Sequence, residues 1–280
     1  MFLFSRSTGH PANAAILVAA GLAATTIRAA AADVTYAEPP FEVPSYEVQQ
    51  AETFRNWTLV IGAGARYRPE YEGSDDLEVS PIPFFLFTYD DWLKIDPTGL
   101  EITAFRYEGF SVSALVGYES GRNEDDHDRL RGLGDIDFAA TLGGRAAYEF
   151  GPLEAYATIE QTIGGSESLL GKTGLSLTAP VSQRLILGAK AEATIADDNH
   201  MQAYFGVDAI QAAASGLPEY QAEAGLKRVD ISTSATYLFN ENWLVRGEVG
   251  VGFLTGDAAD SPIVEDDLQP SASLFLGYKF

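Results

Sequence analysis

Apolar and polar residues alternate along most of the chain beyond residue 56. In residues 243–253, every second position from Trp243 to Phe253 is aromatic, aliphatic or Gly, and Arg246 and Glu248 lie between them. A period of two puts successive side chains on opposite faces of a β-strand. The pattern predicts strands over residues 57–67, 109–119, 135–150, 153–163, 172–179, 185–195, 229–239 and 243–253.

The chain ends with one more segment of this kind, SASLFLGYKF at residues 271–280. One of its faces is apolar and ends at Phe280, and the other carries Ser, Gly and Lys, with Phe275 as the exception. A soluble domain would bury such a face in a core, whereas a membrane barrel would turn it toward lipid. The lengths of the strands decide between these two.

The alternating segments are long for a globular protein. All but residues 172–179 run for 10 to 16 residues, whereas globular strands average about 5–6 and a tilted strand crosses a bilayer in about 9–11. Aromatic residues lie near both ends of several segments, for example Trp57 and Tyr67, as in the girdles of outer-membrane barrels. We therefore expect an all-β fold, a closed antiparallel transmembrane β-barrel, rather than a soluble sandwich or a lipocalin-like barrel.

The connections alternate between short turns and long loops. Long loops are expected at residues 69–77, 120–134, 164–171, 196–219 and 255–269. If residues 92–105 form a hairpin that turns at DPTG, the strand count is 12. Residues 196–220 form a loop, a plug or an extra hairpin, so 10 and 14 strands stay open. Barrels of this class keep short turns in the periplasm, which predicts that both termini are periplasmic.

The first 32 residues have the pattern of a cleaved signal peptide. Arg6 precedes a small apolar run of 16 residues, Ala12 to Ile27, and AAAA at 29–32 offers cleavage sites. That run is shorter than the roughly 20 residues of a transmembrane helix. Residues 33–55 are acidic and Pro-bearing and predict a flexible periplasmic lead-in, and residues 56–280 the barrel. The expected location is the outer membrane of a Gram-negative bacterium.

The net negative charge of the chain argues against some classes of binding partner. The chain has 40 acidic and 18 basic residues, and removal of residues 1–32 takes away two arginines and no acid, so the net charge moves from −22 to −24. We expect no binding to nucleic acid, because phosphate recognition needs basic residues. The chain contains no Cys, which excludes disulfides and a lipoprotein anchor.

Sequence signals for chemistry are weak. His127 and His200 lie in stretches of sequence that resemble loops, and we interpret them as parts of charged, exposed loops. Neither G-x-S-x-G nor H-E-x-x-H is present, and a set formed by His127 with Asp257 or Asp260 has no support from spacing. We expect no enzyme activity, no catalytic residues, no metal site and no cofactor. Acidic loops predict a solvated rim that divalent cations bridge to outer-membrane lipid and lipopolysaccharide.

Charged residues in mid-strand are expected to face the barrel lumen. Residues of both signs there most simply pair across strands, although a narrow channel for small solutes remains an alternative. The predicted lumen charges are Arg145, Glu149, Glu160, Lys190, Glu192, Arg246 and Glu248.

Several stretches resemble the MipA/OmpV family, the MltA-interacting outer-membrane proteins. The matching pieces are GAGARYRPEYEGS (62–74), PIPFF (81–85), RGLGDID (131–137), ASGLPEYQAEAG (214–225), LTGDAADSPIV (254–264) and GYKF (277–280). The family's motif residues fall here in predicted loops. They are Tyr71, Gly73, Ser74, Gly216, Pro218, Asp257, Asp260 and Pro262.

The resemblance implies a non-enzymatic barrel. For some members it implies a scaffold that joins a murein synthase to a lytic transglycosylase, and others are linked to adhesion or stress adaptation. It also implies that Tyr278 and Phe280 form a carboxyl-terminal signal read by the barrel-assembly machinery. Loops outside the cell cannot touch a periplasmic enzyme, so the motif residues serve the barrel's structure or an outward function, or else the topology is inverted.

Overall fold

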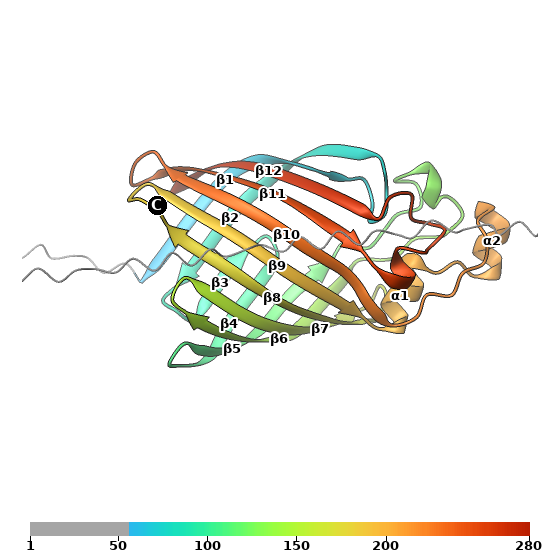
Figure 1. The fold of residues 1–280 in the computed structure, drawn as a ribbon, viewed down its shortest axis with the longest axis horizontal. Helices are drawn as coiled ribbons and strands as arrows, with labels where there is room; N and C mark the ends of the chain where they lie inside the picture. Colours follow the sequence, from blue (N-terminus) through green and yellow to red (C-terminus); the bar gives the residue numbers. More distant parts are fainter. Residues whose placement is uncertain (1–55) are drawn as a thin grey trace, which may run out of the picture. The chain divides into compact units, whose positions relative to one another are not determined.

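The computed structural model describes residues 56–280, and the predicted signal peptide and lead-in lie outside the described residues. The chain forms a closed antiparallel barrel of twelve strands (Figure 1), which confirms the predicted fold and removes the alternatives of 10 and 14. The strands are β1 (Trp57–Pro69), β2 (Leu77–Tyr89), β3 (Leu93–Asp96), β4 (Gly99–Tyr107), β5 (Phe110–Glu119), β6 (Ala139–Phe150), β7 (Leu153–Ile163), β8 (Leu169–Pro180), β9 (Leu185–Ala196), β10 (Gly225–Leu238), β11 (Trp243–Leu254) and β12 (Leu268–Lys279).

Each strand pairs with its sequence neighbours, and β1 closes the barrel against β12. Ala63 lies opposite Leu276, and the N–H of Phe280 donates to the carbonyl of Leu59 at 2.9 Å. The hairpin predicted at residues 92–105 is present as β3 and β4. The strand predicted to start at residue 135 starts at Ala139 instead, because the carbonyl and N–H of Ile136 bond to Arg122 within a loop.

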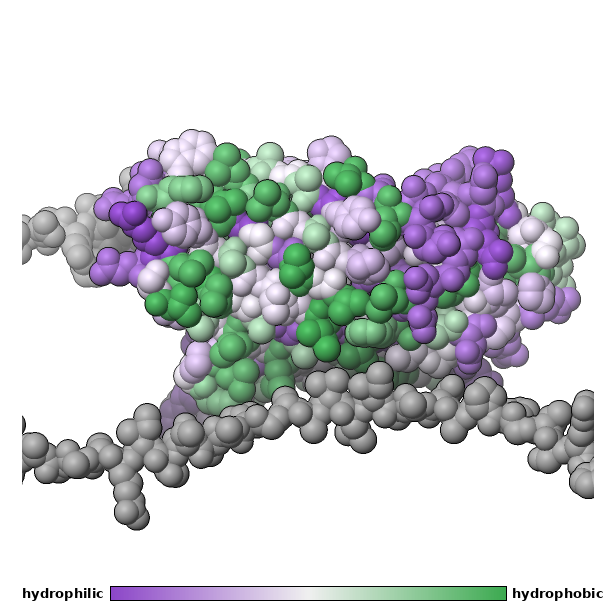
Figure 2. Space-filling model, turned by 45° about the horizontal axis from the view of Figure 1, so that its top comes forward, coloured by the Kyte–Doolittle hydropathy of each residue, from purple (hydrophilic) through white to green (hydrophobic). Residues whose placement is uncertain are grey.

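The outer face of the barrel is apolar. Side chains such as Val79, Leu142, Val249 and Leu274 point outward and are largely exposed, as lipid-facing residues must be in a membrane barrel. Figure 2 shows hydrophobic and pale residues along the flank and hydrophilic ones gathered toward the loop end. Among the described residues, no helix is long and apolar enough to cross a membrane.

Short turns gather at one end of the barrel, here called the turn end, and long loops at the other, the loop end. The long loops hold helices α1 (Asp198–Phe205) and α2 (Ala209–Ser215) and the short 3-10 helices η1 (Asp128–Leu130) and η2 (Gly256–Ala258). Figure 1 shows α1 and α2 at the loop end. The region 196–220, left open by the sequence, is therefore a loop with two helices.

The loops pack into a cap that contains the main hydrophobic core. We define the cap as residues 70–76, 120–138, 164–168, 197–224 and 255–267. The largest fully buried apolar side chains lie in it: Phe205, Leu130, Met201, Ile263 and Val207. They form two clusters, one around Met201 and Phe205 and one around Tyr71, Leu130 and Ile263. Because the lumen is largely polar, it cannot form a hydrophobic core, and the largest buried apolar side chains lie in the loops instead.

Replacing Phe205 by Ala should loosen the cap and leave the barrel closed. The side chain is fully buried, and removing a buried Phe costs about 3–5 kcal/mol. Limited proteolysis should then cut within residues 197–224, while the barrel keeps its heat-modifiable migration in gels. Ile210→Ala is the control, because Ile210 is 81% exposed. Resistance of Phe205→Ala equal to that of Ile210→Ala would contradict a cap held by this core.

Candidate functional site

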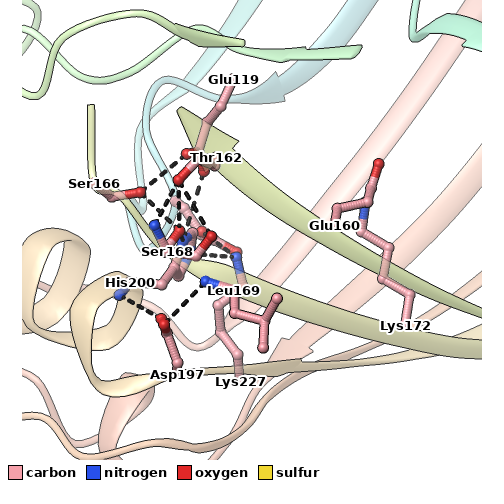
Figure 3. Close-up of polar contacts among 11 residues, drawn as sticks. Glu119, Glu160, Thr162, Ser166, Ser168, Leu169, Lys172, Asp197, His200 and Lys227 are labelled. Carbon is pink, nitrogen blue, oxygen red and sulfur yellow. Dashed lines mark hydrogen bonds and ion pairs between the residues drawn. The ribbon is translucent and has the colours of Figure 1, made fainter. Parts of the chain in front are cut away.

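A chain of polar side chains crosses the barrel at its loop end. Glu119 Oε1 lies 3.6 Å from His200 Nδ1, and His200 Nε2 lies 3.1 Å from Lys227 Nζ. Lys227 in turn pairs with Glu72 at 3.1 Å. We call Glu119, His200, Lys227 and Glu72 the mouth bridge. Figure 3 shows its first three members together at the end of the barrel wall.

The bridge joins opposite walls. Glu119 ends β5 and Lys227 begins β10, and four strands separate these two around one side of the barrel and six around the other. Glu72 comes from the loop between β1 and β2, and His200 from α1. The four residues therefore tie together three regions of the rim and the helix that lies over it.

Local structure fixes each member. Asp197 caps α1 by accepting the N–H of His200 at 3.0 Å, a standard N-cap arrangement. The ring of Tyr204 stacks on that of His200 with centroids 4.5 Å apart. At Lys227 the pairing of β10 with β9 shifts by one residue, between Leu226 and Arg228. This bulge turns both Lys227 and Arg228 toward Glu72, and Arg228 lies 3.4 Å from it.

The electrostatics of the bridge favour a neutral imidazole. Burial and the adjacent Lys227 ammonium lower the pKa of His200 from 6.5 to about 3. Burial alone would raise the pKa of Glu72, but the charges of Lys227 and Arg228 outweigh it and hold that pKa below its usual value. An ammonium only donates, so Nε2 of His200 accepts from Lys227 and Nδ1 carries the proton toward Glu119 and Ser168.

The arrangement does not match a serine hydrolase. Ser168 Oγ lies 3.4 Å from His200, but on the same Nδ1 atom that faces Glu119, and Lys227 occupies Nε2. A triad needs the acid and the nucleophile on opposite ring nitrogens. Ser168 is also fully buried, with its hydroxyl near those of Thr162 and Ser166. These groups form a closed hydrogen-bond network.

The two histidines differ from each other. The prediction that His200 lies in an exposed loop is wrong, because His200 is 1% exposed on α1. His127 caps η1 and contacts Asp76 at 3.3 Å. Asp257 instead accepts the N–H of Glu223, so His127 and Asp257 do not form the set considered from sequence. Within residues 56–280, no group of three His, Asp or Glu side chains is placed to hold a metal ion.

The first group of family-motif residues joins the β1–β2 loop to the β11–β12 loop. The hydroxyl of Tyr71 donates to the carbonyl of Ile263 at 3.0 Å. Gly73 has φ of +105°, and a Cβ there would lie 2.6 Å from Val264, so no other residue fits without displacement. Its N–H donates to the buried side chain of Gln269. Ser74 is buried beside it and bonds the N–H of Asp76.

The remaining motif residues shape the rest of the cap. Gly216 ends α2 in the left-handed conformation, and Pro218 follows it on the surface. The carbonyl of Asp257 accepts the hydroxyl of Tyr220 at 2.9 Å. The N–H of Asp260 donates to Gly256 at 3.0 Å, and the carbonyl of Pro262 accepts a bond from the Arg129 guanidinium. All eight motif residues therefore lie in the cap.

The predicted lumen charges form short-range pairs. Arg145 contacts Glu154 at 2.6 Å and Glu101 at 3.6 Å. The other pairs are Lys172 with Glu160, Lys190 with Glu192, Arg246 with Glu248 and Arg106 with Glu149. At the turn end Tyr278 packs against Trp243 and Phe280, with ring centroids 5.1 and 4.9 Å apart.

The family model "MltA-interacting protein MipA" matches residues 61–280. The chain belongs to the MipA family. The match begins within β1 and covers the rest of that strand, the other eleven strands and the whole cap. The architecture described here, with twelve strands, a loop-end cap and a mouth bridge, is therefore the form that the MipA family takes in this chain.

Solved outer-membrane barrels are similar to the chain only in outline. The NanC porin has 7% identity and a TM-score of 0.43, over 79% of this chain and 100% of that one. The KdgM porin has 10% identity and a TM-score of 0.38, over 79% and 99%. The outer-membrane protein OmpT of Vibrio cholerae has 9% identity and a TM-score of 0.35, over 80% of this chain and 98% of that one. Likenesses this distant say nothing about function. No curated protein sequence matches the chain.

Sequence reasoning missed the mouth bridge. Glu72 and Glu119 lie at loop boundaries where carboxylates are common, and nothing in their spacing joins them to Lys227. One signal was readable: Asp208 followed by Gln211 is a capping box, and Asp197 three residues before His200 is an N-cap pattern. These two would have predicted helices in residues 196–220.

Acidification should weaken the cap through His200. The unfolded chain takes up a proton at His200 near pH 6.5, whereas the folded cap does so only near pH 3. The contribution of His200 to the free energy of unfolding has its full value above pH 6.5. It falls as the pH drops from 6.5 toward 3, by about 2–3 kcal/mol between pH 6.5 and 4.5. Urea unfolding in detergent micelles across this range measures the loss.

His200→Gln keeps an acceptor for Lys227 but does not titrate, so its unfolding free energy should vary less between pH 6.5 and 4.5. His127→Gln is the matched control, because His127 lies outside the bridge, and it should follow the wild type. Equal pH slopes for the wild type and His200→Gln would show that His200 is not the titrating group.

Proposed function

We propose that this chain is a non-enzymatic outer-membrane scaffold that binds a murein lytic transglycosylase of the MltA type, and through it a murein synthase, on its turn end. The family name supplies the first partner. In this proposal the scaffold holds a periplasmic enzyme at the membrane. It does not act as a channel for solutes.

The orientation follows from the class of barrel. Short turns face the periplasm and long loops face outward in outer-membrane barrels. The carboxyl terminus lies beside the turn at Asn242, since the N–H of Lys279 donates to the carbonyl of Asn242 at 2.7 Å. On this basis the turn end, the carboxyl terminus and the start of β1 face the periplasm, and the cap faces outward. This placement keeps the topology expected from sequence, and the motif residues then serve the cap.

The observation that carries the proposal is the mouth bridge. It ties β5, β10 and the β1–β2 loop together across the barrel, and the buried cap core lies around it. A wide channel needs an open mouth and about 16–18 strands. The pairing of the lumen charges supports the same conclusion, because paired charges brace the wall of a narrow barrel.

The turn end offers a surface of defined chemistry. Asp90, Asp91, Glu108 and Glu241 are exposed there. Beside the first two, a hollow of about 430 Å³ is lined by residues that include Trp92, Phe105 and Arg106. Acidic rims steer basic partners, and an exposed Trp beside a hollow is a typical anchor of protein interfaces. We therefore expect the partner to present a basic surface.

Photo-crosslinking in cells tests the scaffold directly. A photoreactive amino acid at Asp91, and separately at Glu241, should capture a lytic transglycosylase or a murein synthase, identified by mass spectrometry. The same probe at Ile210, exposed on α2 at the loop end, should capture neither. Crosslinks from Asp91 and Glu241 to barrel-assembly factors or lipid alone would refute the scaffold, and capture from Ile210 would refute the orientation.

A further inference from the structure

Most of one edge of β2 pairs with no other strand. Phe87 to Tyr89 pair with β3, but residues 77–86 have strand partners only on β1. The cause is the brevity of β3, whose four residues turn back at Pro97 and Thr98. Among the described residues, neither a strand pairing nor a backbone bond of a loop or turn joins this edge to another segment. The wall therefore has a notch between the loop-end part of β2 and the tip of the β3–β4 hairpin.

The backbone on the notch side has two donors fewer than an ordinary strand edge. The N–H of Asp90 bonds to Asn56 and the carbonyl of Asp76 to Glu70, so even-numbered residues of β2 direct their backbone groups toward β1 and odd-numbered ones toward the notch. Pro81 and Pro83 are odd-numbered and have no N–H. Prolines on an edge prevent pairing with a further strand. The notch is therefore unsuited to a strand of this chain or of a second copy.

The notch lies at the depth of the lipid. Pro81 and Pro83 oppose Ala65 and Ala63, below the exposed ring of Tyr67, and Val79 at its upper end is 69% exposed on the outer face. An unpaired edge in hydrocarbon is costly, because its backbone groups lose their partners. Water from the lumen can reach the remaining carbonyls only if the notch is open to the lumen.

The lumen wall behind the notch is apolar. Ile82, Phe84 and Leu86 alternate with the outward residues of β2 and are half-buried. The ring of Phe84 packs against Phe275, with centroids 5.2 Å apart. A Cβ on Gly64 would lie 2.8 Å from the Phe275 ring, so this ring lies over Gly64. Phe275, the exception in the alternation of β12, thus belongs to an apolar track.

A positive charge lies at the loop-end side of this track. Arg66 stands opposite Ser80, two residues from Ile82 toward the loops. It is exposed, and it is absent from the ion pairs of the described residues, whereas Arg68 on the same strand pairs with Glu78 at 3.3 Å. From Ser80 to Leu86 the strand extends roughly 20 Å, comparable with the roughly 15 Å hydrocarbon depth of one leaflet.

We propose that the notch is a lateral entrance from the membrane into the lumen for an anionic amphiphile with a single hydrocarbon chain. The chain would lie along Ile82, Phe84 and Phe275, and the anionic head at Arg66. A hydrocarbon chain needs no backbone partner, so the prolines favour it over a strand. This inference does not rest on the scaffold proposal.

Photolabelling with a long-chain fatty acid that carries a diazirine in its tail tests the track. In the purified full chain in lipid nanodiscs, the label should map to Ile82, Phe84, Leu86 or Phe275, and an excess of unlabelled fatty acid should abolish it. Labels confined to outward residues such as Val249 and Leu274 would show contact with bulk lipid alone and would overturn the proposal.

Displacement of a fluorescent fatty acid tests the head site. Arg66→Ala should weaken binding about tenfold, the loss expected for one charge-assisted hydrogen bond. Arg68→Ala, the matched control, should change it less than twofold, since Glu78 already pairs with Arg68. Equal effects would overturn the assignment of Arg66. Efficient disulfide linkage between copies of Pro83→Cys, together with loss of the photolabel, would show that the notch binds a second copy instead.

Discussion

The closure of β1 on β12 is the constraint on which the rest of the structure depends. In lipid every backbone N–H and carbonyl needs a partner within the protein, and twelve paired strands meet this need almost everywhere. The outer face must then be apolar and the lumen polar, so the wall itself has no hydrophobic interior. The notch beside β2 is a stretch of wall where the ladder stops, and there two prolines reduce the number of unpaired donors.

A hydrophobic core forms instead where the loops meet. Phe205, Met201, Leu130 and Ile263 are fully buried in the cap, and the residues predicted as family motifs, Tyr71 and Gly73 among them, bond these loops to one another. Tyr71 and Gly73 join the first loop to the last, which are distant in sequence and adjacent in the closed barrel. The mouth bridge adds a polar tie across the same end, where breaking one partner of a buried pair costs several kcal/mol.

Much of the fold follows from local pattern. Strands such as β11 and β12 were predictable because lipid on one side and water on the other impose a strict period of two, and the alternation of turn and loop lengths gave the topology. The start of β6 was misplaced because residues 135–138 continue the alternation while Ile136 bonds to Arg122. The burial of His200 was missed since it depends on Lys227 and Glu119, far away in the chain. Long-range pairing of this kind leaves no local signal.

The notch was also hidden in the sequence, although its residues were noticed. The PIPFF stretch resembled the family, and Phe275 broke the alternation, but only the register of β2 with β1 and β3 shows that both lie at one gap. A proline in a strand marks an edge, and in a closed barrel no edge is expected. The structure resolves this conflict, because Pro81 and Pro83 lie on the part of the β2 edge that β3 does not reach.

Single-channel recording in planar bilayers is the most direct test of the closed mouth. The wild-type chain should give no lasting conductance steps, while Lys227→Met, which removes the cation between His200 and Glu72, should open the mouth and give steps. Lys190→Met, which alters a lumen pair away from the bridge, should behave as the wild type. Steady wild-type conductance that Lys227→Met leaves unchanged, and that neutralising Arg145 alters, would contradict the closed mouth and identify a narrow channel.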